Sequence, residues 1–196
     1  MPVPDRAGYR RRAFSWSQPC AMFAQRRLHV MRPERMVTRR LASRDCRMTK
    51  QYLEDFAAGQ VFTSNRLQVD KQQILAFASK FDPQPYHLDE EAARQSVFKG
   101  LAASGWHTAA MTMRLLVESE FQPADGILGL GLEELSWPRP VRPGDELRVE
   151  AEVLEVRASR LRDDRGAIRV RVTTFNQNDQ PVQNFTATLL VMCKPV

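Results

Sequence analysis

The chain has 196 residues, of which 43% are apolar and 27% are charged, a composition typical of one globular domain with at most a terminal extension. No apolar run approaches the ~20 residues that span a membrane, so we expect no membrane partner. The net charge of +6 is uneven, because residues 1–47 hold twelve Arg and three acidic residues, which leaves 17 basic and 20 acidic residues in the remainder. The remainder therefore gives no support for nucleic-acid binding.

The three cysteines are odd in number and do not have the spacing of metal ligands. They are Cys20, Cys46 and Cys193. This pattern argues against a disulfide framework and favours a reducing compartment, so we expect a cytoplasmic protein.

Residues 1–47 lack sustained periodicity and contain no apolar segment followed by a small-residue cleavage site, so a secretory signal is not expected. We predict a disordered extension, which could be an upstream stretch preceding a start at Met48, where the more ordinary "MTKQYLEDF" begins. Two alternatives stay open. One is a transit peptide, which would place the protein in the mitochondrial matrix, and the other is an arm for nucleic acid or membrane. Residues 48–196 are the predicted folded domain.

A short strand is predicted in "QVFTSNRLQV", and Asp70 then resembles the N-cap of a helix with a capping-box partner at Gln73. The apolar residues of this helix recur at helical spacing and are Ile74, Leu75, Phe77, Ala78 and Phe81. Pro83 should end the helix. Asp89 can cap a second short helix.

A longer helix is predicted from Ser104, a good N-cap, in "AASGWHTAAMTMRLLVES". It is apolar nearly all round, which is typical of a buried helix. We therefore expect its Met and Trp residues to belong to the core. The main apolar stripe comprises Trp106, Ala109, Ala110, Met113, Leu116 and Val117.

After this helix the period of the apolar residues changes from 3.6 to 2, which predicts strands. Four are expected, in "ILGLGLEELSW", "ELRVEAEVLEV", "AIRVRVTTF" and "VQNFTATLLVM". The alternation shifts at Leu154, which indicates a bulge. The fold class is therefore α+β, with a meander of four antiparallel strands packed round the long helix.

The stretch "FDPQPYHLDEEAA" places Asp82 and His87 five residues apart, with Pro83 and Pro85 stiffening the peptide. A carboxylate and an imidazole can together orient a water molecule and exchange its proton. Asp82 is a weak base in water and would need burial to raise its pKa. The alternative is a plain turn between helices, with Asp82 as a cap and His87 on the surface.

Ser104 and Gly105 open the long helix, whose first N–H groups are unpaired and carry partial positive charge. The Gly105 N–H could polarise a carbonyl, as an oxyanion hole does. Close packing of the helix start is the other explanation of this glycine. Ser104 is a cap rather than a nucleophile, since its surroundings are not G-x-S-x-G.

Asp82 to His87, followed by "DEEAA", "FKG", "SGWHT" and "LSWPRPVRPGDEL", resembles the MaoC-like dehydratase family, the (R)-specific enoyl-CoA hydratases. The resemblance covers about residues 50–193. It implies a hot-dog fold, an antiparallel sheet wrapped round a long central helix. It also implies a homodimer or higher homo-oligomer formed by sheet pairing, with a substrate tunnel near the interface.

The resemblance also implies an activity, the addition of water to a trans-2-enoyl thioester to give an (R)-3-hydroxyacyl thioester. Asp82 and His87 would activate the water, Gly105 would supply the oxyanion-hole N–H, and Gln84 and Ser104 would complete the substrate site. The expected partner is an acyl-CoA or acyl-carrier-protein thioester, with no metal and no redox cofactor. Phe81 and Gln84 depart from the family's Gly and Asn, which could change the acyl substrate, slow the enzyme or abolish its activity.

Two other functions remain open at this point. The same fold and oxyanion hole could serve a hot-dog acyl-CoA thioesterase, with one carboxylate activating water on the carbonyl carbon. The departures at Phe81 and Gln84 could instead mark a non-catalytic acyl-CoA-binding protein. The paired Asp and His favour hydration over both.

Overall fold

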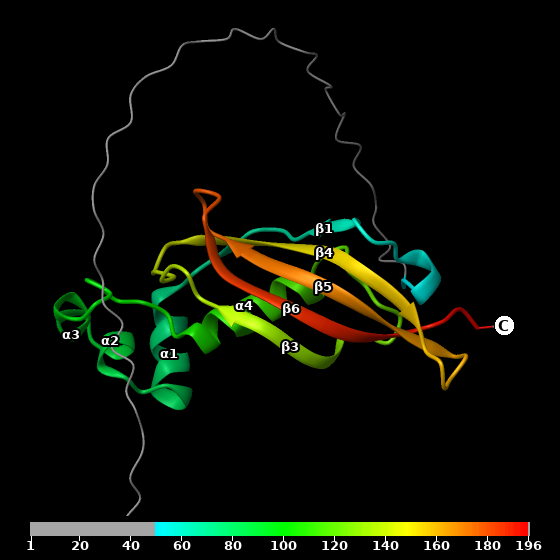
Figure 1. Cartoon of the computed structure of the whole chain (residues 1–196). Helices are drawn as coiled ribbons and strands as arrows, with labels where there is room; N and C mark the ends of the chain where they lie inside the picture. The colour runs from blue at the N-terminus through cyan, green and yellow to red at the C-terminus, as the bar shows by residue number, and fades with distance from the viewer. Residues whose placement is uncertain (1–49, 196) are drawn as a thin grey trace, which may run out of the picture. The chain divides into compact units, whose positions relative to one another are not determined.

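The computed structural model of the protein describes residues 50–195 (Figure 1). The predicted extension, residues 1–47, lies outside them, so that prediction stays untested. The helices are η1 (Leu53–Asp55), α1 (Lys71–Phe81), α2 (Pro85–Leu88), α3 (Glu90–Gln95) and α4 (Gly105–Val117). The strands are β1 (Val61–Thr63), β2 (Leu67–Gln68), β3 (Leu128–Ser136), β4 (Glu146–Ala158), β5 (Arg165–Phe175) and β6 (Pro181–Met192). Among the described residues, no helix has the length and apolar character to cross a membrane.

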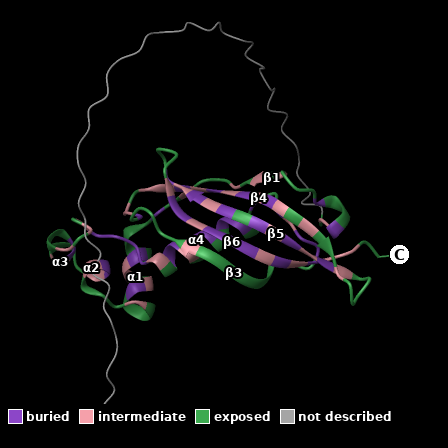
Figure 2. Ribbon diagram, viewed as in Figure 1, coloured by how far each residue is buried: buried purple, intermediate pink, exposed green. Residues whose placement is uncertain are grey.

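All strands belong to one antiparallel sheet, in the order β1-β4-β5-β6-β3, with β2 paired to β4. Buried and less buried residues alternate along β4 and β5. The sheet curves over α4, and buried residues, purple in Figure 2, recur along its central strands. This arrangement confirms the predicted α+β class and the central helix. The predicted bulge is also present, as a shift of pairing between Val153 and Glu155.

The predicted meander of four strands is wrong in one respect, because β3 pairs with β6 and not with β4. Only β4, β5 and β6 form a meander, and residues 137–145 connect β3 to a strand that is not its neighbour. The period of 2 indicates which face of a strand is buried, but it carries no information on the neighbouring strand. The first predicted strand is also split in two, as β1 and β2.

The predicted helix caps are found where the sequence places them. The Asp70 carboxylate accepts a hydrogen bond from the Gln73 N–H at 2.9 Å, and the Asp89 carboxylate accepts one from the Ala92 N–H at 2.7 Å. Helix α1 ends at Phe81, just before the Asp82–Pro83 bond. One prediction for α1 is wrong, since Phe81 was assigned to the apolar face and its side chain is 63% exposed.

Helix α4 buries a different face from the one predicted. Trp106, Met113 and Val117 of the apolar stripe are exposed, Trp106 by 60%. The buried residues are His107, Thr108, Met111, Thr112, Leu115 and Leu116. The buried hydroxyls carry no large penalty, because each finds a partner: Thr108 donates to Ser104 O and Thr112 to Thr108 O. A criterion based on apolarity alone therefore selects the wrong side of this helix.

A buried polar cluster joins α4 to the sheet and to residue 137. The Thr112 and Thr174 hydroxyls lie 2.7 Å apart, and Gln183 Nε2 donates to Thr112 Oγ1 at 3.1 Å. The same amide accepts a hydrogen bond from Trp137 Nε1 at 2.8 Å. Because its members satisfy one another, the cluster fixes the helix, two strands and an indole ring in one arrangement.

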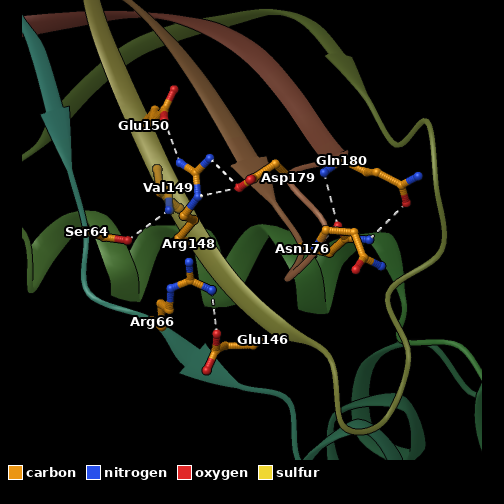
Figure 3. A network of polar contacts seen from close by, with 10 residues as sticks. Ser64, Arg66, Glu146, Arg148, Val149, Glu150, Asn176, Asp179 and Gln180 are labelled. Carbon is orange, nitrogen blue, oxygen red and sulfur yellow. Dashed lines mark hydrogen bonds and ion pairs between the residues drawn. The ribbon is translucent and has the colours of Figure 1, made fainter. Parts of the chain in front are cut away.

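A second polar network holds the β5–β6 turn against β4 (Figure 3). Arg148 contacts the Glu150 and Asp179 carboxylates, at 2.5 and 2.9 Å, and lies over the Phe175 ring. Gln177 from the same turn donates to Asp145 at 2.9 Å. The end of the 137–145 connection is thereby attached to the sheet.

His107 gives a prediction for stability. Its ring is 6% exposed and stacks on Phe77 at 4.7 Å, and Nδ1 has no partner among residues 50–195. Burial lowers its pKa below the ordinary 6.5. The unfolded chain therefore binds a proton more readily, and the free energy of unfolding should fall as pH drops below about 6.5.

His107→Phe keeps the stack and removes the titrating group. We expect the difference between the free energies of unfolding at pH 7.5 and pH 5.5, measured by urea denaturation, to be smaller in the variant than in the wild type. An equal difference in both proteins would contradict the burial argument.

Candidate active site

Helices α1, α2 and α3 gather at the end of the sheet where α4 begins (Figure 1). A pocket of about 600 Å³ opens there. All five residues predicted for the site line it, namely Asp82, Gln84, His87, Ser104 and Gly105. Other walls come from residues 97–98, from the start of α4 and from the 137–145 connection.

Asp82 is the C-cap residue of α1, and both oxygens of its carboxylate accept hydrogen bonds. Ser104 Oγ donates to Oδ2 at 2.6 Å, and Gln84 Nε2 donates to Oδ1 at 2.7 Å. The Ser104 bond is the main cause that lowers the pKa of Asp82, with Gln84 and nearby His87 adding to it against the effect of partial burial. The rise in pKa that would make Asp82 a stronger base is therefore not found, and Asp82 is an ionised acceptor at neutral pH.

The stiff peptide between the prolines turns His87 inward. Gln84 is extended, as expected before a proline, and Pro85 occupies the first turn of α2. His87 is buried, and its Nδ1 lies 2.8 Å from Ala102 O. Because a carbonyl only accepts, Nδ1 must carry a proton, and in the neutral tautomer Nε2 then keeps a lone pair.

His87 Nε2 and Asp82 Oδ2 are 3.5 Å apart. Neither atom can donate to the other when the ring is neutral, so both present lone pairs to the same region of the pocket. A group with two acidic hydrogens, such as water, is the natural ligand for such a pair of acceptors.

The start of α4 combines a cap, a free donor and a tight contact. Ser104 Oγ accepts from Trp106 N–H at 3.2 Å, which confirms it as the N-cap. Gly105 N–H has no acceptor in residues 50–195. A Cβ on Gly105 would lie 2.8 Å from Trp137 Cε2, so close packing also requires glycine here. The two explanations of this glycine are thus compatible.

Several pocket residues were not singled out from the sequence. Tyr86 donates its hydroxyl to Gln84 Oε1, which orients the Gln84 amide toward Asp82. Trp137 packs against Gly105, and Arg139 and Arg142, which follow it in the 137–145 connection, also line the pocket. The available signal was the aromatic and cationic content of "LSWPRPVRPGDEL". Within the described residues, no cluster of His, Cys, Asp and Glu could hold a metal ion.

Comparisons with a family model, with a related sequence and with solved structures point to the same family. Residues 55–176 match the model of the MaoC like domain. The chain is 38% identical over 142 residues to the uncharacterized protein YdeM of Bacillus subtilis (strain 168), covering 72% of this chain and 98% of YdeM. The MaoC-like dehydratase from Rhodospirillum rubrum has 55% identity and a TM-score of 0.72, over 74% of this chain and 99% of that one. The R-hydratase PhaJ1 from Pseudomonas aeruginosa has 28% identity and a TM-score of 0.57, over 73% and 86%.

The Ser104 hydroxyl gives a prediction that needs no assay of activity. Because its hydrogen bond is the main cause of the low pKa of Asp82, Ser104→Ala should raise that pKa, as measured by carboxyl ¹³C NMR titration. Gln84→Ala should raise it less, and Ser104→Thr should keep it low. A pKa of Asp82 that does not change in Ser104→Ala would refute this assignment.

Proposed function

The chain belongs to the MaoC-like dehydratase family, and from that membership we propose that it catalyses the reversible hydration of a trans-2-enoyl thioester to an (R)-3-hydroxyacyl thioester. The observation that supports this most directly is the meeting of three groups in one pocket: the Nε2 atom of His87, an ionised Asp82 and the free N–H of Gly105.

In the proposed reaction a water molecule donates its hydrogens to His87 Nε2 and Asp82 Oδ2. Its oxygen attacks the β-carbon while Nε2 takes one proton. The electron pair of the double bond moves to the thioester oxygen, where the Gly105 N–H stabilises the enolate-like charge. The imidazolium then returns the proton to the α-carbon, so that water has added across the bond and His87 is neutral again.

Asp82 acts in this scheme by its charge and position. A carboxylate that stays ionised holds the water and stabilises the imidazolium formed beside it. Ser104 and Gln84 keep it ionised and oriented. The longer side chain of Gln84, compared with the family's Asn, is accommodated by its bonds to Asp82 and Tyr86. Since no electron transfer occurs, we propose no cofactor beyond the CoA or acyl-carrier-protein thioester.

Purified protein should hydrate crotonyl-CoA, followed by the loss of enoyl absorbance. Asp82→Asn and His87→Ala should each lower kcat/KM on the order of 10²–10⁴-fold, since each removes a group that handles the water. Glu91→Gln, on the exposed side of α3, is the matched control and should behave as the wild type.

Inactivity of the wild type on short, medium and branched enoyl-CoAs would argue against hydration. Release of free thiol from acyl-CoA, detected with a thiol reagent, would indicate a thioesterase instead. Binding of acyl-CoA without turnover, and without any effect of His87→Ala, would indicate a non-catalytic protein.

We also propose that residues 48–196 form the folded unit and that two copies pair through β3. This strand is at the edge of the sheet, and its outer side has no partner strand among residues 50–195. Leu128, Leu130 and Leu132 are exposed on it, next to the exposed stripe of α4. An apolar pocket of about 420 Å³ lies between β3 and α4. A second copy, presenting the same strand and stripe, would cover both the free edge and the apolar surface.

Leu130→Glu should convert the dimer to a monomer, because it places a charge in the proposed apolar interface. Light scattering after size-exclusion chromatography would measure the mass. Leu161→Glu, in the exposed turn between β4 and β5, is the control that should leave the mass unchanged. A monomeric wild type would reject the proposed pairing.

A further inference from the structure

Two arginines line the pocket that holds Asp82 and His87. Arg139 and Arg142 both come from the 137–145 connection, and Asp82 is the one acidic side chain among the lining residues. Its oxygens already accept from Ser104 and Gln84. Neither arginine forms an ion pair with any residue in the described part of the chain.

Besides Arg139 and Arg142, three arginines of the described residues lack a carboxylate partner, Arg157, Arg160 and Arg162, and none of these three lines this pocket. The other arginines are each paired with a carboxylate, namely Arg66, Arg94, Arg114, Arg148, Arg165, Arg169 and Arg171. The residues after position 47 carry more acidic than basic groups, so carboxylates are not scarce. The two pocket arginines therefore leave their guanidinium groups without a carboxylate partner among residues 50–195.

Arg142 is half-buried and its guanidinium is held in place by the backbone. Nη1 donates to Leu101 O at 3.3 Å and Nη2 to Phe98 O at 2.5 Å. A Cβ on Gly100 would lie 3.0 Å from Nη1, so the chain passes close to this group. Two of the five guanidinium N–H groups are thus used and three remain for a ligand. The Asp145 carboxylate binds the backbone N–H of Arg142 at 2.7 Å but forms no ion pair with its guanidinium, so these remaining donors can bind an anionic ligand.

Arg142 is bound to the same segment that orients His87. Leu101 precedes Ala102, whose carbonyl binds His87 Nδ1. The guanidinium is therefore fixed one peptide unit from the carbonyl that orients the proposed base. Arg139 is exposed at the rim and donates to Pro181 O at 3.1 Å, which leaves most of its donors free.

We propose that Arg139 and Arg142 form an anion subsite for the thioester substrate, a conclusion that rests on the proposed function and extends it. The shared chemistry is a phosphate or carboxylate bound by guanidinium N–H groups. Such an anion can come from two parts of the substrate, the phosphates of its carrier or a carboxylate at the end of the acyl chain.

Four substrates separate the two sources. They are crotonyl-CoA, the crotonyl thioester of N-acetylcysteamine, which lacks phosphates, and the two corresponding glutaconyl thioesters, whose acyl chains end in a carboxylate. Each is assayed with the wild type, Arg139→Gln, Arg142→Gln and Arg142→Lys. Arg171→Gln, whose side chain pairs with Glu152 and lines no part of this pocket, is the matched control.

If the subsite takes carrier phosphates, either Gln variant should lower the kcat/KM ratio of crotonyl-CoA to crotonyl-N-acetylcysteamine by roughly tenfold. If it takes an acyl carboxylate, the wild type should prefer the glutaconyl to the crotonyl N-acetylcysteamine thioester, and that preference should fall by a similar factor in Arg142→Gln. In both cases Arg142→Lys should recover part of the loss. Equal effects on all four substrates, or no effect, would overturn the proposal.

The anion subsite can be tested even if the protein does not catalyse hydration. If the wild type hydrates none of the four thioesters, binding of free CoA and of glutaryl-N-acetylcysteamine can be measured by titration calorimetry. The anion subsite then predicts weaker binding of one of them to both Gln variants than to Arg171→Gln. Equal binding of both ligands by all these proteins would reject the subsite independently of catalysis.

Discussion

The side-chain amide of Gln183 lies fully buried between the sheet and α4, and both ends of this amide are used. Its nitrogen donates to Thr112 on the helix, and its oxygen accepts from the Trp137 indole. An amide in such a place is unfavourable unless it is fully bonded. The Gln183 side chain thus fixes the positions of both α4 and the Trp137 indole. Because the Trp137 ring lies against Gly105, this bond also determines the surroundings of the first N–H of α4.

The candidate active-site pocket depends on that fixed helix end in a second way. Ser104 accepts from the helix backbone and donates to Asp82, so the carboxylate is positioned relative to α4 and not only relative to its own loop. Ala102, two residues earlier, positions His87. One short segment therefore orients the Asp82 carboxylate, the His87 imidazole and the Gly105 N–H together, although these come from three different helices or helix ends.

Many local features of the fold could be predicted from the sequence. Strand pairing and contacts between distant side chains could not. Caps at Asp70, Asp89 and Ser104 were found because capping depends on neighbours in the chain. The place of β3 beside β6 was missed because strand alternation does not encode partners. The apolar stripe predicted to be buried is largely exposed on α4, because an exposed apolar surface looks the same in a sequence as a core.

The candidate active site likewise combines features that local sequence indicates with contacts between residues distant in the chain. The spacing of Asp82 and His87 indicated that they could act together, whereas the lowered pKa of Asp82 depends on Ser104, twenty-two positions away. Trp137 acts through contacts with Gly105 and Gln183, which lie far from it in the chain and which no local pattern specifies.

The partner of His87 Nδ1 is a main-chain carbonyl, not a side chain. A substitution of the side chain at position 102 does not remove this carbonyl. The tautomer of the imidazole therefore does not depend on which side chain stands there. Change in the basicity or aim of the ring must instead arise from residues that shift the path of the backbone.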